Sequence, residues 1–378
     1  MSKFNTVRLG NVTEVITKGT TPTTIGFEFQ EQGINFLKIE CISEMGDFLP
    51  QKFEHISNEC NEKLKRSQLK ENDILFSIAG AIGRTAIVTT NVLPANINQA
   101  LSIIRLNDNR LIHNYVLYAL NSDSTLKQFE KQKQGVAQLN ISLKNVSDLE
   151  IPLPPLEIQQ QIAENLDKVT HLIDLCNTIL EKLDLLVKSR FTEMFGDFET
   201  LIDSWETKCF SDVTLNYDST RKPVKDADRK KMQGIYPYYG ATGIVDYVND
   251  YRIDGEYLLI SEDGKALEFR NKNIAFIAQG KIWVNNHAHV IQCKSTMNMI
   301  FLMYYMNNRD ISLWVTGIDQ KKLNRENLDK MPVAVPPIEL QTQFAEFVQS
   351  VDKSKLAVKK VLEKAETLKK SLMQEYFG

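Results

Sequence analysis

The feature that most constrains this chain is an internal repeat at a fixed offset of 182 residues. The segment GVAQLNISLKNVSDLEIPLPPLEIQQQIAE (residues 135–164) aligns without gaps with GIDQKKLNRENLDKMPVAVPPIELQTQFAE (residues 317–346). Ten of the thirty aligned pairs are identical, and nine of the other twenty exchange one apolar residue for another. The same offset relates Phe195-Gly196 to Phe377-Gly378. The chain is therefore predicted to consist of two halves, each ending in the same structural unit.

Each repeat copy predicts a short strand, a proline pair and then a long helix. The pairs at 154–155 and 336–337 stand where proline is tolerated, at a helix start and just before it. Glu157 and Glu339 follow in the first turn, where the positive end of the helix dipole favours an acid. Apolar residues then recur at steps of three and four, as in a coiled-coil seam. The predicted seam positions are Ile158, Ile162, Leu166, Val169, Ile173 and Leu180 in the first helix and Leu340, Phe344, Val348, Val351, Val358 and Leu362 in the second.

A helix with one apolar stripe has to bury that stripe, and two copies in one chain offer each other as partners. Because a whole domain separates the two helices, we expect them to pair in antiparallel orientation. The alternative is that each helix packs only against its own domain. Lys355 and Lys369 interrupt the stripe of the second helix.

Two regions of ordinary domain size precede the helices: residues 1–150, which we call module one, and residues 197–335, which we call module two. Short apolar runs bounded by Gly, Asn or Asp predict strands in both. The modules diverge outside the repeat, but residues 97–101 resemble residues 285–289 at an offset of 188. We therefore predict an α+β fold with two mixed α/β domains of one topology. Two long antiparallel helices, in units 151–196 and 336–378, would separate the domains as a coiled coil in a pseudo-two-fold arrangement.

The sequence carries no motif that supports catalysis in this chain. It has no phosphate-binding loop of the GxxxxGK[ST] kind, no GxGxxG and no Asn-Pro-Pro-aromatic motif of an amino-methyltransferase. His287 and His289 would share one face of a strand, but no Cys or acid stands at ligand spacing, so we predict no metal site. We expect a non-catalytic chain with no cofactor of its own.

The composition indicates in which cellular compartment the protein is expected. The five cysteines are scattered without a CxxC pair, which argues against a disulfide framework and a zinc site. No run approaches the ~18 apolar residues of a membrane span, and the first residues form no apolar signal segment. We expect a cytoplasmic protein with no membrane partner. The net charge of −3 does not indicate a nucleic-acid partner, so any such site must be local.

Local candidates for DNA contact do occur. Six of the eleven residues in RKPVKDADRKK (221–231) are basic, which predicts phosphate contacts, the alternative being a solvated loop. A small polar loop takes the analogous place in module one, and an arginine after a Gly-rich turn could contact guanine. The Asn, Gln and His residues of the similar segments could contact adenine, or they could cap strands. The candidates are Thr20, Thr21, Arg84, Asn98, Gln99, Arg221, Lys222, Lys225, Asn286 and His287.

Taken together, these features resemble the specificity (S) subunit of type I restriction–modification systems over essentially the whole chain. The resemblance rests first on LEIPLPPLEIQQQIAE and MPVAVPPIELQTQFAE, whose units each end in Phe-Gly. YYGATGIVDYV, EYLLISEDG and GKIWVNNHAHVI in module two resemble the same family. NDILFSIAGAIGRTAIV and NQALSIIRL do so in module one.

The resemblance implies that each module is a target-recognition domain for one half of a bipartite double-stranded DNA site. The helices would set the gap between the halves and dock two modification (methyltransferase) subunits. S-adenosylmethionine would belong to those partners, and ATP and Mg²⁺ to a restriction subunit where one joins. The base-contacting residues of the family vary, so our candidates rest on chemistry alone. Because neither module is basic overall, an adaptor or clamp with two protein-binding modules and no DNA stays the alternative.

Overall fold

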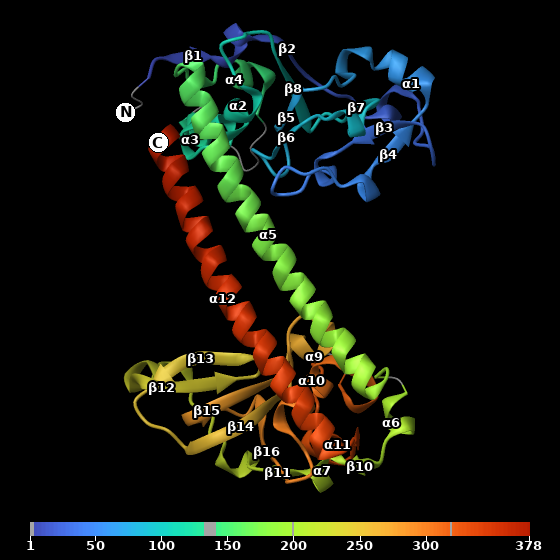
Figure 1. The fold of residues 1–378 in the computed structure, drawn as a ribbon, viewed down its shortest axis with the longest axis vertical. Helices are drawn as coiled ribbons and strands as arrows, with labels where there is room; N and C mark the ends of the chain where they lie inside the picture. The colour runs from blue at the N-terminus through green and yellow to red at the C-terminus, as the bar shows by residue number, and fades with distance from the viewer. Residues whose placement is uncertain (1–3, 132–140, 199, 318–319) are drawn as a thin grey trace. The chain divides into compact units, whose positions relative to one another are not determined.

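The structure, a computed structural model, describes residues 4–131, 141–198, 200–317 and 320–378 (Figure 1). The first residues of the predicted repeat, 135–140, lie outside these ranges. Contacts divide the chain into two compact units. Unit 1 contains Met1–Cys176 and Lys360–Gly378, and unit 2 contains Asn177–Lys359. Each unit therefore holds one module together with parts of both long helices.

Module one is a small α+β domain. Its strands are β1 (Thr6–Arg8), β2 (Thr13–Lys18), β3 (Ile34–Leu37), β4 (Glu54–Ile56), β5 (Ile74–Ser77), β6 (Thr85–Ile87), β7 (Ala95–Ile97), β8 (Leu101–Leu106) and β9 (Glu150–Pro152). Its helices are α1 (Asn58–Lys63), α2 (His113–Leu120), α3 (Asp123–Lys131) and α4 (Leu143–Ser147). Short 3₁₀ helices are η1 (Leu9–Val12), η2 (Pro22–Ile25), η3 (Ile39–Cys41), η4 (Pro50–Lys52), η5 (Lys65–Ser67) and η6 (Thr90–Val92).

Module two has longer strands. These are β10 (Thr207–Cys209), β11 (Thr214–Asn216), β12 (Gln233–Gly240), β13 (Gly243–Val248), β14 (Ile253–Ser261), β15 (Ala275–Val284), β16 (Ala288–Cys293) and β17 (Pro332–Ala334). The helices are α6 (Leu201–Ser204), α7 (Phe210–Val213), α8 (Asp226–Arg229), α9 (Lys265–Phe269), α10 (Met299–Asn308) and α11 (Arg325–Lys330). The 3₁₀ helices are η7 (Asp218–Thr220), η8 (Lys230–Met232) and η9 (Ser312–Trp314).

The two modules share one strand topology. The antiparallel order β2-β8-β5-β6 of module one reappears in module two as β11-β16-β14-β15. A second group has the order β4-β3-β7 in module one and β13-β12-β15 in module two, where β12 pairs only with the end of β15. The pair β3-β7 is parallel, and so is the equivalent pair β12-β15. The pair β1-β9 likewise corresponds to β10-β17. The predicted common topology is thus confirmed although the two sequences diverge.

Two helices of equal length follow the modules. α5 spans Leu156–Phe195 and α12 spans Ile338–Phe377, each beginning directly after its proline pair. Within unit 1, the Asn165 amide donates to the Tyr376 hydroxyl at 3.2 Å, and Val169 and Ile173 pack against Ala365. Within unit 2, Lys355 pairs with Asp184 and the Phe191 ring contacts Phe344. Rising numbers in α5 meet falling numbers in α12, so the helices pack antiparallel, as predicted.

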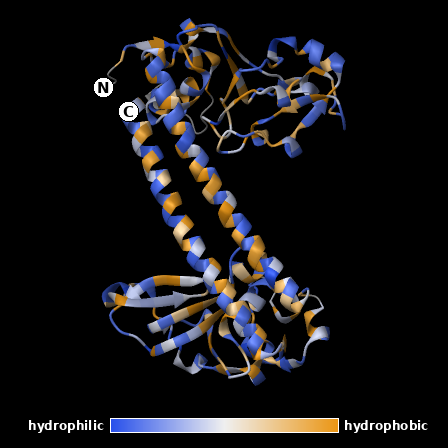
Figure 2. Cartoon of the chain, in the orientation of Figure 1, coloured by the Kyte–Doolittle hydropathy of each residue, from blue (hydrophilic) through white to orange (hydrophobic). Residues whose placement is uncertain are grey.

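The predicted seam is the buried face of these helices, and Figure 2 shows apolar residues recurring along both. Every predicted seam position is buried or half-buried, from Ile162 and Leu166 in α5 to Phe344 and Val348 in α12. Each helix also ends in an aromatic residue that enters the core of the module at that end. The Phe195 ring lies 5.0 Å from Phe301 of α10, and the Phe377 ring lies 5.4 Å from Tyr115 of α2.

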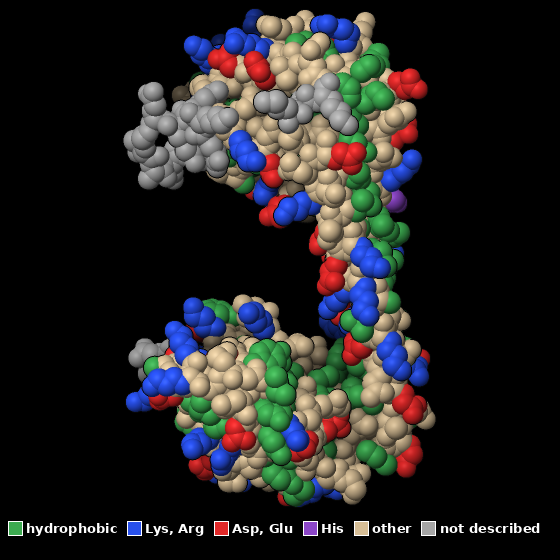
Figure 3. All heavy atoms as spheres, turned by 90° about the vertical axis from the view of Figure 1, so that its left-hand side faces the viewer, with side chains coloured by type: hydrophobic (Ala, Val, Ile, Leu, Met, Phe, Trp, Pro, Cys, Tyr) green, Lys and Arg blue, Asp and Glu red, His purple; other side chains and the backbone are tan. Residues whose placement is uncertain are grey.

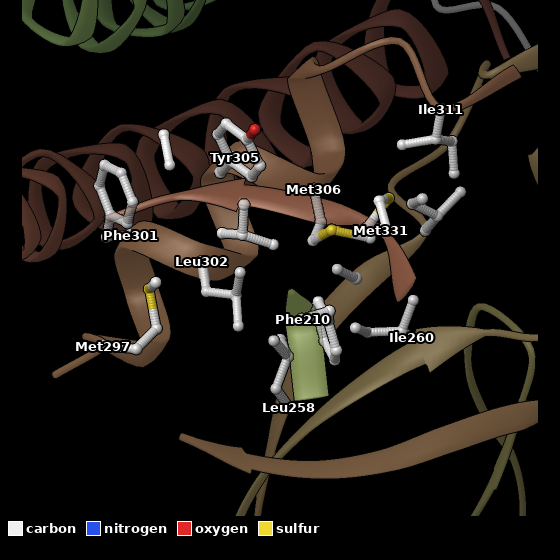
Figure 4. Close-up of a cluster of buried hydrophobic side chains, with 14 of the residues drawn as sticks. Phe210, Leu258, Ile260, Met297, Phe301, Leu302, Tyr305, Met306, Ile311 and Met331 are labelled. Atoms are coloured by element: carbon white, nitrogen blue, oxygen red, sulfur yellow. The ribbon is translucent and has the colours of Figure 1, made fainter. Parts of the chain in front are cut away.

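Each unit has its own hydrophobic core. In unit 2 the core lies between strand β14, with Leu258 and Ile260, and helix α10, with Phe301 and Leu302 (Figure 4). α7 closes it with Phe210. The equivalent core of unit 1 joins β5 and β8 to α2 and α4. The fold is α+β, with two mixed domains and two long paired helices, as the sequence predicts. The two units follow one plan: the module of unit 1 packs against the start of α5 and the end of α12, and the module of unit 2 packs against the end of α5 and the start of α12.

Candidate nucleic-acid interface

A tight turn occupies the same topological place in each module. Residues 98–100 join β7 to β8, and residues 285–287 join β15 to β16. In both turns an Asn side chain accepts from the backbone N–H two residues later: Asn98 from Ala100 at 3.1 Å, and Asn285 from His287 at 2.8 Å. Such turns fix a short exposed loop at the end of a strand.

The strand register corrects the sequence alignment of these turns by one residue. Leu101 pairs with Ser77 on β5, and Ala288 pairs with Ser261 on β14. Asn98 is therefore equivalent to Asn285, whereas the sequence comparison at offset 188 matched it to Asn286. The offset was misjudged because strand pairing, which a short local similarity does not contain, sets the register. Gln99 and Asn286 then occupy equivalent, exposed positions.

In module one the turn meets the loop that follows β2. The Thr21 hydroxyl donates to the Gln99 side chain, and Thr20 lies beside it, half-buried. Gly19 makes this approach possible, because a Cβ atom there would lie 1.7 Å from the Ile97 carbonyl oxygen. The structure thus brings Thr20 and Thr21 close to Gln99, although Thr21 and Gln99 are 78 residues apart in the sequence.

In module two the basic loop after η7 runs along the end of β15. The Lys222 N–H donates to the Val284 carbonyl at 3.1 Å, and the Trp283 indole donates to the Lys222 carbonyl at 2.7 Å. The side chains of Lys222 and Lys225 are exposed and have no ion-pair partner among the described residues. His287 lies 2.9 Å from both carboxylate oxygens of Asp263 and keeps about half of its side chain exposed.

Arg221 belongs to a buried charged network beneath this turn. Its guanidinium pairs with Glu262, and it lies 3.3 Å from Asp218. His289 is fully buried, with Nδ1 2.7 Å from Asp218 and Nε2 2.9 Å from the Leu323 carbonyl. The network therefore supports the turn from behind, and DNA contact by Arg221 stays a prediction.

The acids of this network have lowered pKa values. Burial alone would raise the pKa of Asp218, but the hydrogen bond from His289, the Val290 N–H and the Arg221 charge together lower it. Burial would likewise raise the pKa of Glu262, and the hydrogen bonds from Arg221 and Lys322 outweigh it. Both carboxylates are thus held in the charged form.

Arg84 has a different environment from the other candidates. Its guanidinium donates to the carbonyls of Ile39, at 3.3 Å, and Ile42, at 2.8 Å, and so ties down the segment around η3. A guanidinium keeps further donors when two carbonyls are bonded, so base contact by Arg84 stays a prediction.

The sequence comparison missed two equivalent glutamines that anchor the long helices. Gln159 is fully buried, accepts from Ile112 N–H at 3.0 Å and donates to the Arg110 and Pro154 carbonyls. Gln341 is also fully buried. Its side chain accepts from the Asn298 N–H at 2.9 Å and donates to the Thr296 and Pro336 carbonyls. The sequence did hold a signal for these residues, because the same residue type, glutamine, stands at both positions of the repeat at the offset of 182.

The residues that the structure describes hold neither a candidate metal centre nor a helix suited to span a membrane. Among them, no group of three or more His, Cys, Asp or Glu side chains is arranged to hold a metal ion. Over the same ranges, none of the helices combines the length and the apolar character that crossing a membrane requires.

Known proteins resemble this chain over most of its length. The model of the type I restriction modification DNA specificity domain matches residues 1–185 and again residues 202–369. The type I restriction enzyme MjaVIII specificity subunit of Methanocaldococcus jannaschii is 24% identical over 98% of this chain and 91% of the relative. The type I restriction enzyme EcoprrI specificity subunit of Escherichia coli is 23% identical over 88% of this chain and 84% of the relative. The Haemophilus influenzae protein S.HindORF215P is 37% identical over 146 residues, only 37% of its own length.

A solved structure has the same fold. The crystal structure of the type I restriction–modification S subunit from M. genitalium covers 100% of this chain, and 96% of that subunit is covered in return. The TM-score is 0.59 at 16% sequence identity. At this identity the likeness concerns the fold.

Proposed function

This chain belongs to the family of type I restriction modification DNA specificity proteins, and from that premise we propose its function. It is the DNA sequence-specificity subunit of a type I restriction–modification complex. Each module reads one half of a bipartite double-stranded DNA target. Two modules with one topology and different exposed side chains suit two half-sites of different sequence.

The observation that carries this proposal is the pair of equivalent turns. Module one presents Gln99 beside Thr21, and module two presents Asn286 and His287 on the turn after β15, to whose last residue the Lys222 backbone is bonded. Side chains with hydrogen-bond donors and acceptors at such turns suit base edges in a groove, and the neighbouring exposed lysine suits a phosphate. An adaptor without DNA is not favoured, because the family match covers both modules.

The long helices set the gap between the half-sites and dock two methyltransferase subunits. Apolar side chains stay exposed on both helices, between charged ones, and green side chains along the helices are visible in Figure 3. Exposed apolar stripes of this kind are typical of partner surfaces. The side chains are Leu172, Leu175, Leu185 and Leu186 on α5 and Leu356, Val361 and Leu368 on α12.

Catalysis belongs to the partner subunits in this proposal. The methyltransferase subunits supply S-adenosylmethionine and transfer the methyl group to adenine, and a restriction subunit, where present, supplies ATP and Mg²⁺ chemistry. This chain contributes positioning and sequence selection in the cytoplasm.

Methylome sequencing tests the proposal. The chain is co-expressed with its methyltransferase partners in a host without adenine methylation, and modified bases are mapped by single-molecule sequencing. We expect one bipartite motif with two unlike halves and a fixed gap. His287→Ala should relax one half and Gln99→Ala the other, while Lys52→Ala, which changes an exposed residue of η4 that belongs to neither turn, should change neither half. A continuous motif, or no new methylation, would contradict the proposal.

A further inference from the structure

A groove of about 590 Å³ opens in module one, on the side of the Thr20–Thr21 loop. One wall holds Thr20, Ile25 and Phe27, and the other runs from the end of α1 through Leu64 to η5. Lys63, Lys65 and Arg66 line the second wall. These three basic residues were not among the candidates from the sequence, because only folding brings them to the loop after β2.

The cations of this groove are free of acidic partners. Lys63, Lys65 and Arg66 are exposed, as is Lys18 at the end of β2. Among the described residues, no carboxylate oxygen lies within 4.0 Å of their charged nitrogens. Arg66 makes a single long hydrogen bond, 3.4 Å to the Lys18 carbonyl, which draws its guanidinium toward the Thr20 side. Three unneutralised charges on one wall of a concave surface favour an anionic ligand.

The basic wall is rigidly fixed to the strand that leads into the turn. The buried Ser67 hydroxyl donates to the Asn96 side chain at 2.7 Å. Asn96, fully buried on β7, donates in turn to the Asn61 side chain at 3.0 Å and to the Leu64 carbonyl at 3.1 Å. Since the turn at residues 98–100 follows β7 directly, these hydrogen bonds connect the wall to the turn. A ligand bound in the groove therefore positions the turn.

We propose that this groove binds the phosphate backbone of double-stranded DNA next to the half-site that module one reads. The inference rests on the proposed function and adds the residues that fix the position of the DNA. Ammonium and guanidinium groups bond phosphate oxygens without distinguishing bases, so they set orientation and affinity, and the turn supplies the sequence preference. The three cations of the basic wall suit successive phosphates of a duplex.

The test uses the complete complex of this chain with its methyltransferase partners. Binding to its target duplex is measured over a range of salt concentrations for the triple variant Lys63→Gln, Lys65→Gln and Arg66→Gln. Each lost phosphate contact lowers the salt slope of log K by about 0.9, so we expect a decrease of about 3 and weaker binding to every sequence. The methylated motif should not change. The double variant Lys63→Arg and Lys65→Arg preserves both positive charges, so its salt slope should equal that of the unmodified complex.

A matched control removes the same charge elsewhere in module one. Lys52→Gln, Lys127→Gln and Lys144→Gln affect exposed residues that do not line the groove, and they should leave the slope unchanged. An unchanged slope in the groove variant, with specific binding intact, would overturn the groove assignment alone. A changed methylation motif would overturn it too, because the residues would then read bases. Absence of specific binding by the unmodified complex would instead refute the proposed function.

Discussion

At the scale of single residues, two buried amides connect the modules to the long helices. Gln159 and Gln341 each satisfy one backbone N–H and two carbonyls that would otherwise be unpaired inside the protein. A buried group left without its partner costs about 1–3 kcal/mol. These side chains therefore fix how each helix leaves its module, which a hydrophobic contact alone would not do.

Replacing Gln341 with leucine should destabilise unit 2 by about 3 kcal/mol, because three backbone groups lose their partner. All three tryptophans, Trp205, Trp283 and Trp314, lie in unit 2, so urea unfolding followed by tryptophan fluorescence reports on this unit. Gln343→Leu changes an exposed glutamine of the same helix and should stay within about 0.5 kcal/mol. Equal effects of the two substitutions would show that the buried amide has no special role.

The network beneath the second turn predicts acid sensitivity. The pKa values of Asp218 and Glu262 are lowered from their ordinary 3.8 and 4.5. A lowered folded-state pKa contributes stability that is present above the ordinary value and is lost as the pH falls through the folded value. Tryptophan fluorescence should therefore show unit 2 losing stability below about pH 4.5. Asp218→Asn should flatten this dependence, while exposed Asp254→Asn should preserve it. An identical profile for all three proteins would contradict the assignment.

The candidate residues show what a sequence can and cannot predict about a site. Asn286 and Gln99 were predicted and stand exposed on turns, because local turn chemistry is visible in the sequence. Arg221 was predicted from a run of basic residues, yet its guanidinium pairs with Glu262, 41 residues away. Such an ion-pair partner is brought near by strand pairing between distant segments, and a run of basic residues in the sequence does not indicate that pairing.

At the scale of elements, the paired helices follow the heptad pattern closely, and the two lysines that interrupt it have acidic neighbours. The Lys355 ammonium lies 2.6 Å from Asp184, with only 19% of the lysine side chain exposed. Burial lowers the pKa of Lys369, and the charge of Asp174 opposes that shift. α12 thus supplies the cations and α5 the acids of the seam. Polar pairs of this kind specify register and partner more than stability.

A seven-residue insertion in both helices tests their role in setting the gap. The insertions are placed after Cys176 in α5 and after Lys359 in α12, where the compact units divide, so each module keeps its contacts. One heptad preserves the seam and adds about 10 Å at 1.5 Å per residue. We expect a gap longer by about 3 bp in the methylome, with both half-sites unchanged. The same insertion in the exposed 45–47 loop should leave the gap as it was.

The helix pair was also the part of the fold that the sequence predicted best. Its seam, its start after the proline pairs and its antiparallel packing all follow from spacing and from the repeat. The strand order of the modules was not derivable, because the modules share few residues and the pairing of β12 with β15 is non-local. The repeat unit, with β9 and β17 at the same offset, and the short similarity of residues 97–101 to residues 285–289 indicated that the modules were related.

At the scale of the whole molecule, two modules of one topology should act independently. Exchanging residues 197–335 for the corresponding module of a relative should change one half of the methylated motif and leave the other half and the gap intact. Retaining Gln341 and the helices keeps the attachment of the new module unchanged. The methylome of the chimaera provides the measurement, and a change in both halves would refute independent recognition.

The division of the chain into units has a consequence for its synthesis. Unit 1 is discontinuous: residues 360–378 complete a core that residues up to 176 begin, and Phe377 covers Tyr115. A ribosome must therefore finish all of unit 2 before the first module can close. Until then the Tyr115 ring of a nascent chain lacks the Phe377 ring that packs against it.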